Sequence, residues 1–241
     1  MRRPPLAALL VTYESAGDIG TALDSIVRQV PEETPIVVVD EASTDGTAEA
    51  VRRACPRAIR FLERGNRGFA SGMQRAAAVC PAERYLLLNP DAWLEDGALE
   101  RLTAALDRRP DFAGASPLVL RPEPDGRIDS LGIGISSALS PFSIGHGRPS
   151  TEAPGAGEVF GFHGAVALIR GEILAEEGGF DPRFFCYQEE FDLCWRARRS
   201  GWRFLAEPAA RVRHRVSASS GENRAWREFQ LERNRVWAIA K

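Results

Sequence analysis

The stretch Leu86-Leu87-Leu88-Asn89-Pro90-Asp91-Ala92 joins an apolar run to an abrupt polar ending. Three consecutive leucines are typical of a strand that is covered on both faces, as in a parallel sheet. Because Pro90 cannot donate to the ladder, we expect the strand to end there and Asp91 to lie in the crevice beyond the sheet. Ligands bind at this edge of open α/β sheets, and a carboxylate there can hold a hard cation and a phosphate. The alternative is an ordinary Asn-Pro turn.

Strands and helices alternate along the first part of the chain. Apolar runs predict strands at residues 6–11, 36–39, 58–62 and 85–88, and helical spacing of apolar residues predicts the helices between them. This alternation favours a mainly parallel sheet with right-handed crossovers. We therefore expect an α/β fold.

The pattern changes after a predicted helix around residues 99–106. Residues 121–157 are rich in Gly, Pro and Ser and have no sustained period, which predicts a mobile loop or lid. A strand at 166–169, a helix at 189–199 and a short strand at 211–214 follow. The chain stops inside a predicted helix that has no terminator, which suggests that the natural protein continues.

Composition limits the function classes. The 241 residues, 44% hydrophobic and 27% charged, predict one soluble globular domain, and a net charge of −2 gives no reason to expect a nucleic-acid partner. The cysteines lack C-x-x-C spacing and are interpreted as free thiols in a reducing cytosol. They are Cys55, Cys80, Cys186 and Cys194. No segment approaches the ~20 apolar residues of a membrane span. Arginines late in the chain leave peripheral membrane contact open.

Polar residues follow four of the predicted strands or open the next helix. They are Thr12-Tyr13-Glu14, Asp40, Asn66-Arg67-Gly68 and Asn89-Pro90-Asp91. Each alone is compatible with a helix cap. Since parallel strands bring their carboxyl ends to one edge, we expect the four to line a single crevice.

Six strings in this order resemble glycosyltransferase family 2, a family of inverting enzymes with the GT-A fold, and in particular its bacterial rhamnosyltransferase-like branch. The strings are VTYES (11–15), VVVDEASTDGT (37–47), NRGFASG (66–72), LLLNPDAWL (86–94), GGFDPRFFCYQEEFDLCWRARRSGW (178–202) and ERNR (232–235). The resemblance implies a single GT-A domain over residues 1–241. It joins a Rossmann-like half for the nucleotide-sugar donor, 1–94, to an acceptor and catalytic half, 95–241, around one mixed, mainly parallel sheet.

The same resemblance implies a donor site. Residues expected around the base and ribose are Thr12, Tyr13, Glu14 and Asp40. Asn66, Arg67 and Gly68 would flank the nucleotide, with Gly68 allowing close backbone approach. Asn89 and Asp91 occupy the family's acidic metal motif, so that Asp91 is the principal carboxylate on Mg²⁺ or Mn²⁺. In some relatives a residue at the position of His214 is a further metal ligand. The alternative for His214 is a half-buried histidine that caps a strand.

The segment Glu189-Glu190-Phe191-Asp192 corresponds to the family's catalytic-base segment. Glu190 is our first choice of base, ahead of Asp192 and Glu189, and it must come within about 2.6–3.2 Å of the acceptor hydroxyl. Alternatively, these carboxylates only favour the helix amino terminus through its dipole. Three positions depart from the family pattern. They are Asn89 in place of Asp, Glu190 in place of Asp, and Glu41 where relatives commonly have Asn.

The predicted function is inverting transfer of a sugar from a nucleotide-diphosphate donor to a hydroxyl of a sugar or lipid-linked saccharide acceptor. The expected setting is cell-surface polysaccharide or glycolipid assembly, in the cytoplasm or at the inner face of the membrane, and a homodimer is left open. Two alternatives stand. A non-catalytic nucleotide-sugar binding or scaffold domain fits the departures from the motif. A sugar-phosphate nucleotidyltransferase would need a glycine-rich phosphate loop, which Val11-Thr12-Tyr13-Glu14 lacks.

Overall fold

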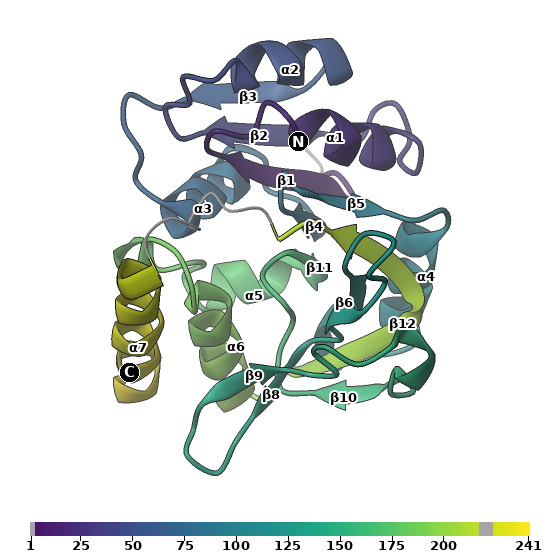
Figure 1. Ribbon diagram of the computed structural model, residues 1–241, viewed down its shortest axis with the longest axis vertical. Coiled ribbons are helices and arrows are strands. Elements are labelled where there is room, and N and C mark those ends of the chain that lie inside the picture. Colours follow the sequence, from purple (N-terminus) through teal and green to yellow (C-terminus); the bar gives the residue numbers. More distant parts are fainter. Residues whose placement is uncertain (1–2, 217–223) are drawn as a thin grey trace.

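The computed structural model describes residues 3–216 and 224–241. Strands and helices alternate through its first part, as predicted (Figure 1). The elements are β1 (Ala7–Thr12), α1 (Ile19–Val27), β2 (Ile36–Asp40), α2 (Thr47–Ala54), β3 (Ile59–Leu62), α3 (Phe69–Val79) and β4 (Arg84–Leu88). The four strands pair in parallel in the order β4-β1-β2-β3. Thr12 is in register with Asp40, so the carboxyl ends of β1 and β2 share one edge.

The second part extends the same sheet with mixed directions. Its main elements are β5 (Ala92–Leu94), α4 (Ala98–Asp107), β6 (Phe112–Leu120), β11 (Val166–Arg170), α5 (Gly171–Glu176), α6 (Glu189–Arg199), β12 (Arg203–His214) and α7 (Arg224–Ala240). β11 is antiparallel to both β4 and β6, and β12 is parallel to β6. The expected α/β architecture around one mixed sheet is therefore confirmed.

Two strands of this part differ from the prediction. Phe112–Leu120 forms the buried strand β6, which the sequence did not indicate because Gly114, Ser116 and Pro117 interrupt its apolar character. The predicted short strand at 211–214 is the end of β12, whose ladder with β6 is irregular between Glu207 and Arg211. Pro117 pairs at this irregularity, where a missing N–H is tolerated.

The region 121–157 is not an irregular loop, so this part of the prediction was wrong. It contains β7 (Ile128–Ser130), β8 (Ile133–Ile135), β9 (Pro141–Ser143) and the 3-10 helix η1 (Ser150–Glu152), and it ends at the first residue of β10 (Gly157–Val159). β8 and β9 form a separate hairpin, which projects from the lower edge of the molecule in Figure 1. Elements of three residues are too short to produce a periodic pattern.

Helices cover both faces of the sheet. Leu9 of β1 belongs to the cluster that includes Met73 of α3 and Leu193 of α6. The next residue, Leu10, belongs to the cluster of α1, α2 and α4, because successive strand residues face opposite sides. The covered sheet positions its polar strand ends at one rim. None of the described helices combines the length and the apolar character needed to cross a membrane.

Candidate active site

The ends of β1 and β2 form a corner of hydrogen-bonded carboxylates. Asp40, only 4% exposed, accepts hydrogen bonds from Thr12 Oγ1 (2.8 Å), Ser43 Oγ (2.6 Å) and Ser43 N (3.1 Å). Glu14 accepts from Thr44 N at 2.9 Å. Together with Tyr13, which is 42% exposed, these residues form what we call the nucleoside corner. The structure thus brings Thr12, Tyr13, Glu14 and Asp40 together, as expected.

Asp45, which also belongs to this corner, accepts hydrogen bonds on both carboxylate oxygens. Oδ1 accepts from Thr47 N (3.0 Å) and Thr47 Oγ1 (2.5 Å), and Oδ2 accepts from Ala16 N (2.9 Å). Burial is the largest single effect on Asp45 and raises its pKa, but these hydrogen bonds together outweigh it and lower the pKa below its ordinary value. Asp45 is therefore held in its ionised form.

The segment Asn66-Arg67-Gly68 is held by two acceptors. Asn66 Oδ1 accepts from Gly68 N at 2.9 Å, and Glu41 Oε2 accepts from Arg67 N at 2.5 Å. Burial raises the pKa of Glu41, and the hydrogen bond from Arg67 N opposes this. Glu41, which departs from the family pattern, thus anchors the segment 66–68. Sequence reasoning missed this role. Gly68 is required by contact with the second part of the chain, because a Cβ at its φ of +88° would lie 2.4 Å from Phe185 O.

Asp91 and His214 meet beyond the end of β4, and with Asn89 and Asp129 they form the metal corner. β12 pairs with β5 so that His214 is opposite Ala92, which brings His214 Nε2 to 3.3 Å from Asp91 Oδ1. On the other side of the ring, Nδ1 lies 2.8 Å from Asp129 Oδ2. Burial lowers the pKa of His214, but the hydrogen bonds to Asp129 and Asp91 outweigh it and raise the pKa to about 9. Sequence reasoning missed Asp129, which lies in the aperiodic 121–157 region.

The donor set of the metal corner fits Mg²⁺ or Mn²⁺ that is also held by phosphate. Asn89 Oδ1 is buried and has no hydrogen-bond partner among the described residues. Within residues 3–216 and 224–241, no group of three or more His, Cys, Asp or Glu side chains could hold a metal ion. Magnesium is commonly bound by one or two carboxylates, with waters and substrate phosphates as the other ligands. Asp91 and His214, with a nucleoside diphosphate, suit that mode of binding.

Glu189 and Glu190 open α6 in an apolar setting. Their Oε2 atoms are buried and have no hydrogen-bond partner among the described residues. Burial raises the pKa of both, and the charge of Glu190 raises the pKa of Glu189 further. Hydrogen bonds from backbone N–H groups, including that of Gly164, only partly offset this at Glu190. Both carboxyl groups are therefore suited to hold a proton, which is the property of a poised acid or base.

Asp192 lies in a different environment from its two neighbours. It is fully buried and accepts hydrogen bonds from Arg196 Nε (3.0 Å) and Nη2 (2.8 Å). Lys241 Nζ lies 3.0 Å from its Oδ1. These two cations neutralise Asp192 on the inner side of α6, so the structure separates it from the two glutamates.

One short segment lies between Glu190 and the metal corner. A Cβ added to Gly164 would lie 3.2 Å from the carboxyl carbon of Glu190. The ring of His163 is 6.2 Å from that of His214, and Asn89 N donates to Ala165 O at 2.8 Å. The segment 163–165 therefore has Glu190 on one side and the metal corner on the other.

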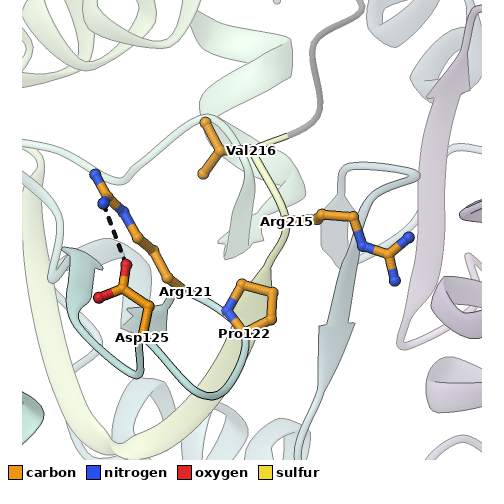
Figure 2. Close-up of a pocket in the computed structure, with 5 residues that line it drawn as sticks. All are labelled: Arg121, Pro122, Asp125, Arg215 and Val216. Carbon is orange, nitrogen blue, oxygen red and sulfur yellow. Dashed lines mark hydrogen bonds and ion pairs between the residues drawn. The ribbon is translucent and has the colours of Figure 1, made fainter.

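A cavity of about 340 Å³ lies beyond the ends of β6 and β12, where His214 ends β12. Figure 2 shows the residues that line it, which are Arg121, Pro122, Asp125, Arg215 and Val216. Arg121 pairs with Asp125 at 3.2 Å, while Arg215 points away from this pair and lies 2.5 Å from Asp18 Oδ1. The cavity is next to the metal corner, because Arg215 follows His214 in the chain.

Solved structures share this architecture. A mannosyltransferase from Pyrobaculum calidifontis, in complex with GDP-Man and Mn²⁺, superposes with a TM-score of 0.70 at 23% identity, covering 100% of this chain and 66% of that one. GalNAc-T7 with UDP, GalNAc and Mn²⁺ gives a TM-score of 0.75 at 14% identity, covering 99% of this chain and 48% of the other. The fold is that of the GT-A glycosyltransferases.

Sequence comparison identifies the family. Residues 4–237 match the profile described as glycosyltransferase like family 2. The chain therefore belongs to glycosyltransferase family 2. It is 27% identical over 246 residues to the N-acetylglucosaminyl-diphospho-decaprenol L-rhamnosyltransferase of Mycobacterium tuberculosis, covering 91% of this chain and 79% of that protein.

Proposed function

We propose that this glycosyltransferase is metal-dependent and inverting, and that it transfers a sugar from a nucleoside-diphosphate donor to a hydroxyl group. The observation that carries the proposal is the position of the segment 163–165. Gly164 lies against Glu190, while His163 and Ala165 lie against the metal corner. A general base and a diphosphate site next to each other are what direct displacement at an anomeric carbon requires.

In this mechanism Glu190 accepts the proton of the acceptor hydroxyl. The hydroxyl oxygen forms a bond to the anomeric carbon as the bond to the donor phosphate oxygen breaks, so the nucleoside diphosphate leaves from the opposite face. The raised pKa of Glu190 supports proton acceptance near neutral pH. The Oε2 atom of Glu190 is buried, which limits access of water that would otherwise hydrolyse the donor.

The metal corner is proposed to hold Mg²⁺ or Mn²⁺ through Asp91 and His214, with Asn89 beside the diphosphate. When bound, the cation neutralises the charge that develops on the leaving diphosphate. Asp129 is proposed to orient His214, because its hydrogen bond at Nδ1 leaves Nε2 toward Asp91. Since the pKa of His214 is about 9, binding of the cation at Nε2 would release the proton held there.

The remaining donor contacts are assigned to the first part of the chain. We place the base and ribose against the nucleoside corner and the nucleotide against the segment held by Glu41. These assignments support dividing the domain into a donor half, 1–94, and an acceptor half, 95–241. Glu189 is assigned as the neighbour whose pKa the charge of Glu190 raises, and Asp192 as an internal ion-pair partner.

The acceptor is proposed to be a saccharide on a lipid diphosphate, by analogy with the name of the mycobacterial relative. Peripheral contact with the inner face of the membrane would follow. The outer face of α7 supports it, since Phe229, Val236 and Trp237 are 60%, 55% and 41% exposed. The guanidinium of Arg233 lies over the rings of Phe229 and Trp237. Aromatic and basic side chains together favour the membrane interface.

The test is a donor screen with the purified chain. UDP-, dTDP-, GDP- and ADP-sugars are incubated with Mn²⁺, and both thermal stabilisation and release of nucleoside diphosphate are measured, with Glu190→Gln as the control. We expect one donor to raise the melting temperature and to be turned over only by the wild type. Tight binding without turnover would indicate a binding domain, and pyrophosphate release from a nucleoside triphosphate would indicate a nucleotidyltransferase.

A further inference from the structure

The turn that precedes α6 has an unusual backbone. Phe185, Tyr187 and Gln188 have φ values of 65°, 69° and 67°, a region that residues with a side chain rarely adopt. Phe185, with ψ −75°, is close to the classic γ-turn, which is strained. Such a turn persists only where its surroundings hold it, and strained turns of this kind cluster at active sites.

The side chain of Asn234, from α7, holds this turn. Asn234 is fully buried, and the two N–H groups of its Nδ2 are shared among three backbone oxygens, those of Phe184 (2.9 Å), Cys186 (3.0 Å) and Tyr187 (2.7 Å). Arg233 Nε donates to Asn234 Oδ1 at 2.9 Å, which orients the amide so that its N–H groups face the turn. α6 and α7 lie side by side in Figure 1, and this contact joins α7 to the start of α6.

The turn leads directly into the two glutamates. Gln188 O accepts the hydrogen bond of Asp192 N (2.9 Å) that begins the helix, so the position of the turn sets that of Glu189 and Glu190. On its other side, Phe185 O accepts from Ala70 N at 3.0 Å, beside Gly68. The donor segment at Gly68 has its own supports in Asn66 and Glu41. Loosening the turn should therefore displace the base more than the donor segment.

We propose that Asn234 is a positioning residue for the catalytic base, acting through the turn 184–188. The inference rests on the proposed function, because it takes Glu190 as the base. It also gives a role to the string Glu232-Arg233-Asn234-Arg235, which none of the donor, metal or base assignments uses.

The first test is Asn234→Asp in the full chain. This change keeps the shape of the side chain but replaces the N–H donors with an oxygen that faces three carbonyl oxygens. We expect kcat for transfer or donor hydrolysis to fall at least 10-fold, while KM for the donor and Kd for the nucleoside diphosphate change less than threefold. The control is Gln230→Glu, which puts an acid at another buried amide of α7, 6% exposed, and should keep kcat within threefold.

The second test is a double-mutant cycle with Glu190→Gln. If Asn234 acts through Glu190, the double variant should lose no more activity than Glu190→Gln alone. Should Asn234→Asp melt below the assay temperature, Asn234→Ala takes its place in the cycle.

Three outcomes would overturn the inference alone, given an active wild type. They are a kcat for the Asn234 variant within twofold of wild type, losses that add in the cycle, and an equal loss in Gln230→Glu. A wild type that neither binds nor cleaves any donor would overturn the proposed function and this inference with it.

Discussion

The nucleoside corner and the start of α6 both present carboxyl groups to the site, but in opposite environments. Asp40 and Asp45 each accept hydrogen bonds from N–H and O–H groups on both carboxylate oxygens, and the pKa of Asp45 is lowered. Glu189 and Glu190 each have a buried oxygen without a hydrogen-bond partner among the described residues, and the pKa of each is raised by burial. The same functional group is thus favoured in its charged form at Asp45 and in its neutral form at Glu189 and Glu190, which is the contrast that the proposed function uses.

The largest expected effect on kcat comes from a change at Glu190, at the start of α6. Glu190→Gln removes the proton acceptor and keeps the shape, so we expect kcat for transfer to fall by roughly 10²–10⁴-fold. Binding of the nucleoside diphosphate, measured by calorimetry, should stay within threefold because the donor corners are unchanged. Asp192→Asn is the comparison, since Asp192 is engaged in ion pairs. A larger loss of kcat in Asp192→Asn than in Glu190→Gln would contradict the assignment.

The next effect concerns the metal corner, where the carboxylate of Asp129 is hydrogen-bonded to the ring of His214. Asp129→Asn weakens the hydrogen bond that fixes His214 Nδ1, so we expect Mn²⁺ affinity in the presence of nucleoside diphosphate to fall about 10–100-fold. Titration calorimetry or the electron paramagnetic resonance signal of free Mn²⁺ measures it. Asp125→Asn, a carboxylate from the same region that pairs with Arg121, should leave the affinity unchanged. An equal loss in both variants would assign the effect to the region and not to His214.

The regularity of the first part explains how much of it could be predicted. The apolar runs around Leu9, Val38 and Leu87 are uninterrupted, so their strands, and the polar residues that end them, follow from the sequence. β6 could not be predicted, because burial in the middle of a sheet imposes small residues there and not a recognisable pattern.

Contacts between distant segments account for what was missed in the site. Asp129 and His214 are 85 residues apart, and Glu41 and Arg67 are 26 apart. No local pattern contains either pair, since both depend on strand register and on loops without a period. The position of Asp91 follows from the predicted end of β4. The contact of Asp129 with His214 beside Asp91 is evident only in the folded chain.

A smaller effect concerns Glu189 and the dependence of folding stability on pH. The pKa of Glu189 is raised in the folded chain, so the folded state binds more protons than the unfolded state above pH 4.5, and stability falls as pH rises through the folded pKa. Glu189→Gln removes this loss. We expect the variant to melt above wild type at pH 7 and the gap to close toward pH 4, with about 2–4 °C for each kcal/mol recovered. A gap that is constant with pH in thermal melts would contradict the raised pKa.

The smallest expected effect has the opposite sign. The pKa of Asp45 is lowered in the folded chain, so its contribution to stability is present above pH 3.8 and is lost as pH falls through the folded value. Asp45→Ala removes the acceptor of Thr47 N at the start of α2, and we expect a cost of about 1 kcal/mol at pH 7. Denaturant unfolding at several pH values measures it, with Glu49→Ala, an exposed residue of α2, as the control. The difference in stability between the Asp45 variant and wild type should shrink toward low pH, where Asp45 is protonated. At pH 7 the Asp45 variant is then less stable than wild type and the Glu189 variant more stable, and this opposite sign is expected when one site favours the charged carboxylate and the other the neutral acid.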